Sequence, residues 1–204
     1  MAGDRRAGYA PNVSAITVRE IRVHEAIESR RSIRRYTSER VWESQVEAVL
    51  EAARLAPSGS NTQPWRFIVI RSDSQREAVA KASHDQKWMM GAPVFIACVG
   101  AISSRIPDYD GPPLDELSDL PELKQVIRDT SIAVEHLVLR ATELGLGTCW
   151  VAWFTQDEIR PVLGVPDDNY VLAVITLGHP AQEPKSRSRH ALEDIVFQEQ
   201  WPQA

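Results

Sequence analysis

The sequence predicts one domain of mixed helices and strands. Its 204 residues, 43% of them hydrophobic, are enough to bury the core of a single domain. Segments with a helical apolar period alternate with short continuous apolar runs, and no internal repeat or low-complexity linker interrupts them. The chain has no run of about 18 apolar residues, so we expect no membrane-spanning segment.

The two ends of the chain are expected to differ from the rest of the domain. Residues 1–16 carry charge, Gly and Pro without the apolar segment of a secretory signal, which predicts a mobile tail and a cytoplasmic protein. Residues 17–204 then form the single domain, whose polar last part, 180–204, predicts an extended arm. The formal net charge of −5 argues against a nucleic-acid-binding surface over the whole protein.

Helices are predicted where apolar residues recur with a helical period between start and stop signals. Thr17 and Glu20 have capping-box spacing, and the period after them continues toward Arg31. Pro57 ends the next helix, and Gly145 is the natural C-cap of a long apolar one. The G-x-G that begins at Gly145 follows a helix, so it is not a dinucleotide-binding fingerprint. The predicted helices cover residues 17–31, 44–56, 73–83, 120–144 and 155–164.

Continuous apolar runs predict the strands. Residues 66–70, 93–100 and 170–178 have the pattern of buried strands, and 149–153 that of a short extended piece. The segment 101–120 is rich in Pro, Asp and Gly, which predicts a surface excursion and a candidate lid.

The cysteines and histidines do not have the spacing of a metal site. Cys98 and Cys149 each lie inside an apolar run, which favours buried free thiols over a disulfide or a metal ligand. The five histidines show no close pairing with one another or with cysteine, so we expect no bound metal.

Four arginines lie within six positions in the segment RRSIRRY, residues 30–36. A solvated basic turn is one interpretation, because short charge runs are commonly wet faces. An anion site is the other, since guanidinium groups bind phosphate oxygens in pairs and Ser32 adds a further donor. The basic run at residues 185–190 leaves the same two alternatives open.

The segment APSGSNTQPWRF, residues 56–67, combines a helix stop with polar side chains. A stop followed by a loop explains Pro57 and Ser58 without any function. It does not explain the amides of Asn61 and Gln63 just before a strand. Amides both donate and accept hydrogen bonds, which suits the edge of a heterocycle with N–H and C=O groups.

Several segments, in their order along the chain, resemble the nitroreductase family of FMN-dependent oxidoreductases. They are ESRRSIRRY, APSGSNTQPWRFIVI, GAPVFIACVG, DTSIAVEHLVLRATELGLGTCW, YVLAVITLGHP and SRSRHALEDIV. The resemblance covers about residues 20–197. It implies an α+β fold of three layers, with a mostly antiparallel sheet of four or five strands and helices on both faces. It also implies an intertwined homodimer, built through the long helix after residue 120, whose C-terminal arm crosses to the partner.

The resemblance implies FMN as the cofactor and gives roles to the first basic segment. Arg30 and Ser32 would bind the FMN phosphate, and Arg31 would lie beside it. Arg34 would approach the N1 and C2=O side of the flavin, where a cation favours acceptance of a hydride. Gln86 would face the pyrimidine edge of the ring.

Residues from elsewhere in the chain would complete the cofactor site in this resemblance. Arg187 and Arg189 would be the terminal pair of phosphate-binding cations, with Lys185 as a competing choice of register. The loop residues of the partner subunit that would reach the flavin are Pro57, Ser58 and Asn61. Backbone N–H groups near flavin N5 and O4 would come from the segment made of Trp150, Val151, Ala152 and Trp153.

The implied activity is reduction of nitroaromatic, quinone or related small-molecule electron acceptors with NADH or NADPH, by a ping-pong hydride transfer. No catalytic side chain is required, because flavin N5 carries the chemistry. Trp153 stands where many relatives have a small residue, and it is expected to narrow the substrate space. Two alternatives remain: a specialised branch of the same fold, such as a reductive dehalogenase, a flavin-fragmenting enzyme or a flavin oxidase, and a non-catalytic flavin-binding protein.

Overall fold

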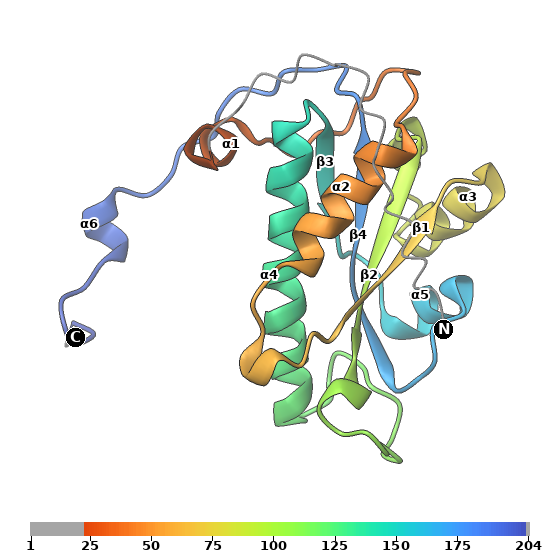
Figure 1. The fold of residues 1–204 in the computed structure, drawn as a ribbon, viewed down its shortest axis with the longest axis vertical. Coiled ribbons are helices and arrows are strands. Elements are labelled where there is room, and N and C mark those ends of the chain that lie inside the picture. The colour runs from red at the N-terminus through yellow and green to blue at the C-terminus, as the bar shows by residue number, and fades with distance from the viewer. Residues whose placement is uncertain (1–22, 203–204) are drawn as a thin grey trace, which may run out of the picture.

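A computed structural model describes residues 23–202 of the chain (Figure 1). The tail expected over residues 1–16 and the capping box expected at Thr17 and Glu20 lie outside the described residues. The first described element is the short helix α1 (Val23–Ser29), which ends directly before the basic segment.

Four antiparallel strands form the sheet. They are β1 (Trp65–Ile70), β2 (Val94–Ala101), β3 (Gly147–Val151) and β4 (Asn169–Gly178), in the order β1-β2-β4-β3. Every residue of β2 is buried, as expected for a central strand. The expectation of a buried strand at residues 66–70 was wrong in part, because β1 lies at the edge, where Arg66 is exposed and the next three residues are half-buried.

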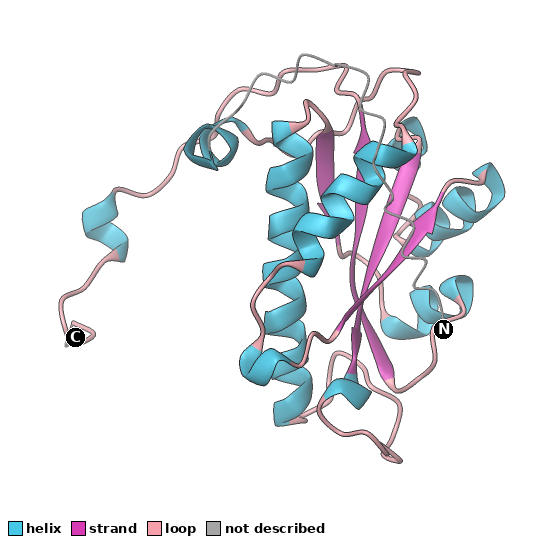
Figure 2. Cartoon of the chain, in the orientation of Figure 1, coloured by secondary structure: helices cyan, strands magenta, loops and turns pink. Residues whose placement is uncertain are grey.

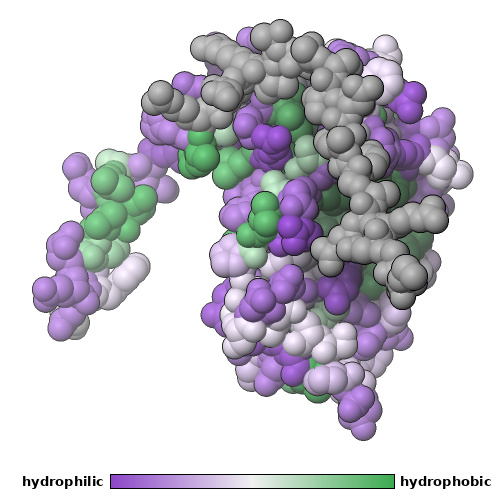
Figure 3. Space-filling view, viewed as in Figure 1, coloured by the Kyte–Doolittle hydropathy of each residue, from purple (hydrophilic) through white to green (hydrophobic). Residues whose placement is uncertain are grey.

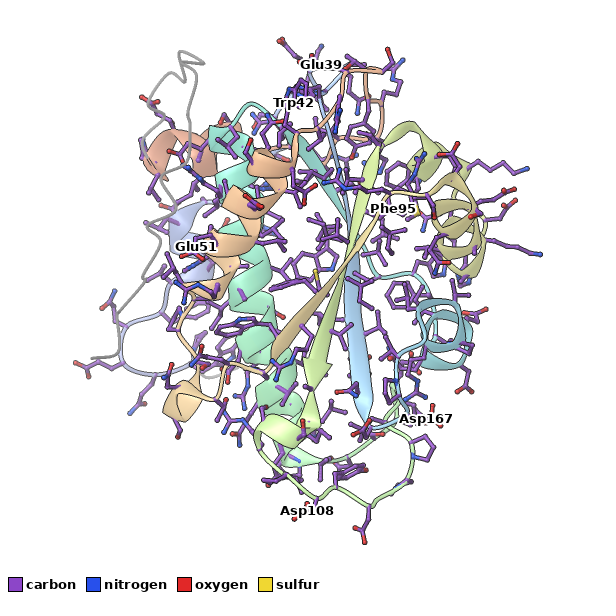
Figure 4. The ribbon with its side chains drawn as sticks, turned by 45° about the vertical axis from the view of Figure 1, so that its right-hand side comes forward. Glu39, Trp42, Glu51, Phe95, Asp108 and Asp167 are labelled. Atoms are coloured by element: carbon purple, nitrogen blue, oxygen red, sulfur yellow. The ribbon has the colours of Figure 1, made fainter. Side chains whose placement is uncertain are left out.

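Helices cover both faces of this sheet, which confirms the predicted three-layer α+β fold (Figure 1). On one face lie α2 (Glu43–Arg54) and α4 (Pro121–Glu143). On the other lie α3 (Asp73–Ala82) and α5 (Gln156–Leu163). Phe95 of β2 is fully buried on the α3 side (Figure 4). Burial of a side chain of this size contributes about 1.5–3 kcal/mol to the stability of the fold. Buried side chains on both faces of the sheet contribute in this way.

The helix boundaries follow the expected signals. Pro121 occupies the first turn of α4, where its missing N–H costs nothing, and Gly145 follows the helix with φ +73°. The backbone N–H of Thr155 donates to the Glu158 carboxylate in a capping box at the start of α5. Gly164 ends α5 with φ +64°, a conformation in which a side chain would be strained.

The segment 101–120 leaves β2 through the 3₁₀ turn η3 (Ile102–Ser104) and lies at one end of the sheet. Ile102 and Leu114 are buried against the first turns of α4, so the start and the middle of the segment are anchored. Asp108 marks its tip, opposite the end of the molecule that carries Glu39 (Figure 4). The role of a lid remains a prediction.

Beyond β4 the chain leaves the body as an extended arm with one short helix, α6 (Leu192–Ile195) (Figures 1 and 2). Its apolar side chains are exposed and form a hydrophobic patch away from the body (Figure 3). They are Leu192, Ile195, Val196, Phe197 and Trp201.

Both cysteines are free and buried, as the sequence predicts. Within residues 23–202, no helix is long and apolar enough to cross a membrane. In the same part of the chain, no group of three or more His, Cys, Asp or Glu side chains is placed to hold a metal ion.

Candidate functional site

The basic segment is fixed between the edge strand β3 and the base of the C-terminal arm. Ser32 forms a parallel bridge with Thr148, and the N–H of Ile33 donates to the Thr148 carbonyl over 2.8 Å. On the other side, the N–H of Ala181 donates to the carbonyl of Arg35 over 2.9 Å. Backbone hydrogen bonds on both sides therefore hold this exposed segment in one position.

Two side chains anchor the same segment in the body. Ile33 is buried and packs closely on Gly147. A Cβ added to Gly147 would lie 2.9 Å from the Cβ of Ile33. The Tyr36 hydroxyl lies 2.6 Å from the carbonyl of Ile33 and 2.6 Å from the hydroxyl of Thr176. Burial raises the pKa of Tyr36 well above its usual range, so the phenol stays neutral and keeps these hydrogen bonds.

A pocket of about 350 Å³ brings the two basic runs of the sequence together. The predicted phosphate ligands Arg30, Ser32, Arg187 and Arg189 all line it, together with Arg31 and Arg34, which were predicted beside the phosphate and at the flavin ring. Lys185 lines it as well, so the structure leaves both choices of register open. A neighbouring pocket of about 420 Å³ shares Arg30 and Arg31 and reaches Gly145 at the end of α4.

The arginines of this pocket lack ion-pair partners among the described residues, although the Glu135 carboxylate is near enough to Arg30 to interact with its charge. Among residues 23–202, no carboxylate lies within ion-pair distance of the five pocket arginines, although the chain carries more acids than bases. Arg31 partly serves the backbone, because its Nη1 donates to the carbonyls of Glu28 and Arg30, each over 2.7 Å. Guanidinium groups gathered without acids fit the phosphate group of a nucleotide-like ligand.

Arg34 connects this pocket to the predicted residue Gln86. Its guanidinium lies 5.7 Å from the ring centre of Trp88, within range of a cation–π contact. The Trp88 indole N–H donates to Oε1 of Gln86 over 3.1 Å, and Gln86 Nε2 donates to the carbonyl of Ser83 over 2.9 Å. The structure thus brings Gln86 toward the basic segment, with its amide already oriented by two neighbours.

The predicted flavin-facing segment 150–153 begins in the last two residues of β3 and continues into the turn that follows. Val151 is buried, Ala152 is exposed, and Trp150 and Trp153 are 38% and 64% exposed. Trp153 stacks on His84 with 4.3 Å between ring centres and 21° between planes. His84 Nδ1 also lies 3.0 Å from the carbonyl of Trp153. Nothing in the sequence pattern pointed to His84, because the contact joins two turns 69 residues apart.

Cys149 lies beneath the basic segment without being a reactive thiol. Burial raises its pKa, and the nearby Arg34 charge and Ser32 hydroxyl offset this only in part. The neutral thiol is a poor nucleophile, so Cys149 acts as a packing residue.

The polar loop that contains Pro57, Ser58 and Asn61 follows α2 and lies at the opposite end of α4 from the chain that follows α1 (Figure 1). Its 3₁₀ turn η1 (Gly59–Asn61) contacts Asp129 in α4. Arg30 and Arg31, in contrast, line the neighbouring pocket together with Thr142, near the end of the same helix. Thirteen residues of helix separate these two positions, about 20 Å along the axis. One chain therefore does not bring this loop and the basic segment together.

Known proteins are similar to this chain over most of its length. The model of the Nitroreductase family matches residues 27–179. A protein of Archaeoglobus fulgidus, whose name gives both NADH dehydrogenase and NAD(P)H nitroreductase, is 32% identical over 162 residues, 77% of this chain and 84% of the relative. An NADH dehydrogenase of Thermus thermophilus is 30% identical over 187 residues, 82% of this chain and 91% of the relative. A protein of Desulfovibrio desulfuricans solved in complex with FMN has 32% identity and a TM-score of 0.74, over 90% of this chain and all of that one.

Proposed function

Since this chain belongs to the nitroreductase family, we propose that it is an FMN-dependent oxidoreductase that uses NADH or NADPH to reduce nitroaromatic, quinone or related electrophilic molecules. The observation that carries this proposal is the pocket in which both basic runs converge without a carboxylate. A family relative was solved with FMN, whose phosphate has the charge and size that such a pocket suits.

Each side of the pocket would have its own task. Arg30, Ser32, Arg187 and Arg189 would hold the phosphate, with Arg31 beside them. Arg34 and Gln86 would face the polar edge of the ring, since Trp88 links both side chains on one side of the pocket. When bound, FMN supplies the hydride chemistry, taking a hydride from NADH or NADPH and passing electrons to a second substrate in ping-pong order.

The chain's own residues would mainly bind and orient. The backbone of residues 151–153 offers N–H groups without using a side chain, and the fixed basic segment offers a preorganised cationic wall. The stack of Trp153 on His84 adds bulk beside this backbone, which favours flat or narrow acceptors over bulky ones.

A homodimer completes the proposed site. The polar loop is about 20 Å from the arginine side of its own chain, so it would serve the pocket of the partner subunit. Support comes from an apolar groove of about 370 Å³ between α1, α2 and α4, lined by Val23, Ala26, Leu55 and Leu139 among others. The exposed apolar side chains of the arm are the complementary surface that a second copy would bring.

The visible spectrum of the purified protein tests this function. We expect a flavin spectrum, FMN as the released chromophore, and loss of the visible absorbance when NADH or NADPH is added anaerobically. Released FAD or riboflavin would contradict FMN as the cofactor. A bound flavin that neither nucleotide reduces would instead favour a non-catalytic flavin-binding protein.

A further inference from the structure

The ion pair between Arg105 and Asp129 binds the backbone of the polar loop at Gly59. Arg105 Nη2 donates to Asp129 Oδ2 over 2.9 Å and to the carbonyl of Gly59 over 3.2 Å. The N–H of Gly59 donates to the same Asp129 oxygen over 3.2 Å. The side chains of Arg105 and Asp129 are only 15% and 12% exposed, so water does little to weaken the pair. One peptide segment is thus held through both its donor and its acceptor.

The part of the loop that follows Gly59 is strained and exposed. Ser60, Asn61 and Gln63 have φ of 56°, 55° and 47°, which is the left-handed region of backbone conformation that residues other than Gly rarely adopt. All three are exposed, so packing of their side chains does not explain the conformation. Such strain persists only where the surroundings impose it, and here the ion pair and the hydrogen bond from Gln63 N–H to Ser58 Oγ (2.9 Å) do so.

Gly59 is the residue that lets the guanidinium come this close. A Cβ at this position would lie 2.7 Å from Arg105 Nη2, whereas it would lie 3.7 Å from Asp129 Oδ2. Its φ is not in the left-handed region, so alanine fits the backbone there. Gly59→Ala would therefore displace the Arg105 head group and leave the rest of the loop sterically allowed.

We propose that Arg105 and Asp129 are positioning residues that hold the polar loop in the shape needed to contact flavin bound to the partner subunit. This inference rests on the proposed function. Asn61 presents its side-chain amide to the outside, with no hydrogen bond to another described residue, so it is free for a ligand brought by a second copy. Arg105 lies in the segment 101–120, so that segment acts on the site through the loop.

Titration of apoprotein with FMN tests the positioning role. The variants are Gly59→Ala, Arg105→Met and Asp129→Asn, with Arg128→Ala as a matched control, an exposed arginine next to Asp129. We expect the first three to weaken FMN binding about tenfold or more, because the loop loses its fixed shape, and the control to bind like wild type. The melting temperature of apo Gly59→Ala should stay within about 2 °C of wild type, since it removes no buried group. A merely structural role would lower that temperature and leave FMN affinity unchanged.

Mixed dimers test whether the loop acts across the interface. Arg30→Ala damages the pocket and Gly59→Ala damages the loop, so neither homodimer should bind FMN tightly. In a dimer of one subunit of each kind, one of the two sites combines an intact pocket with an intact loop. We expect half of the sites to regain wild-type affinity, and no recovery would overturn action on the partner's flavin.

The outcomes separate this inference from the function beneath it. A wild-type protein that binds no FMN overturns the proposed function, and the positioning role with it. A wild-type protein that binds FMN with the same affinity as Gly59→Ala and Arg105→Met overturns the positioning role alone. If Arg105→Met lowers the apo melting temperature, Gly59→Ala decides, because it removes neither charged group from the protein.

Discussion

Arg160 is almost completely enclosed by the protein, whereas the arginines of the basic pocket face an open cavity, although both carry the same guanidinium group. Arg160 Nη1 donates to the carbonyls of Leu114 and Asp167, each over 2.7 Å, and the carboxylates of Asp157 and Asp167 lie 3.6 and 3.8 Å away. The pocket arginines have no such acids among residues 23–202. The difference shows that an arginine with nearby carboxylates and buried carbonyl acceptors stabilises the fold, while one without an ion-pair partner is available to a ligand.

Removal of Arg160 should have the largest effect, and on stability alone. In Arg160→Met the buried carbonyl of Leu114 loses its donor, at about 1–3 kcal/mol, and the carbonyl of Asp167 keeps only the Leu114 N–H. We therefore expect the free energy of unfolding of the apoprotein to fall by about 3 kcal/mol, measured by chemical denaturation. The FMN affinity of the folded variant should not change, because Arg160 does not line the pocket. A loss below about 1 kcal/mol would contradict this assignment.

Removal of Arg30 should have the opposite pattern. A charge-assisted hydrogen bond to phosphate contributes about 1.5–3 kcal/mol, so Arg30→Ala should weaken FMN binding about 10- to 150-fold. The apoprotein should unfold within about 0.5 kcal/mol of wild type, as for other surface substitutions. Arg71→Ala is the control, because Arg71 is partly exposed and paired with Glu43 at 2.5 Å. Equal FMN affinity of wild type and Arg30→Ala would reject the phosphate site.

Single substitutions in the second basic run, residues 185–190, should have a smaller effect on FMN affinity. Arg187→Ala and Arg189→Ala are each expected to weaken FMN binding more than Lys185→Ala, because a guanidinium fork can bind two phosphate oxygens and an ammonium acts as a point charge. We expect differences of about tenfold in the FMN dissociation constant. A largest loss for Lys185→Ala would move the phosphate contacts to that residue.

Asp115, close to Arg160, should show the smallest effect, as a pH dependence of local stability. The N–H of Leu117 and the Ser118 hydroxyl hold the pKa of Asp115 below its usual range. Because the pKa is lowered in the folded state, the stabilisation is present above the ordinary Asp pKa and is lost as the pH falls through the folded value. Hydrogen exchange at Leu117 should therefore differ between wild type and Asp115→Asn at neutral pH, and the difference should disappear as the pH falls through the lowered pKa of Asp115. If the difference in hydrogen exchange between the two proteins did not depend on pH, ionisation of Asp115 would not be its cause.

The sequence predicted those parts of the fold that depend on neighbouring residues. The cap at Gly145 and the helix predicted over residues 155–164 rest on local signals, and α4 and α5 end close to where these signals predict. The edge position of β1 was missed because an apolar run looks alike in a central and an edge strand. Position in the sheet is set by long-range pairing, which no local pattern contains.

The candidate site, too, could be predicted from the sequence only in part. Its cations were visible as two basic runs, and the family resemblance related them to one phosphate. The contact of Arg105 with Asp129 and the stack of His84 on Trp153 were not visible, because they join segments 24 and 69 residues apart. Each also depends on a turn geometry that only the folded chain defines.

The base of the arm pairs with the basic segment through Ala181, and the cations that follow lie on exposed chain. The two walls of one pocket therefore come from opposite ends of the sequence. A protease that cuts after Lys185 would remove Arg187 and Arg189 but leave the sheet and its helices whole. Proteolytic clipping would thus separate the folded body from its cofactor. Bound flavin would shield the same peptide bonds, so resistance to trypsin would report how many molecules carry it.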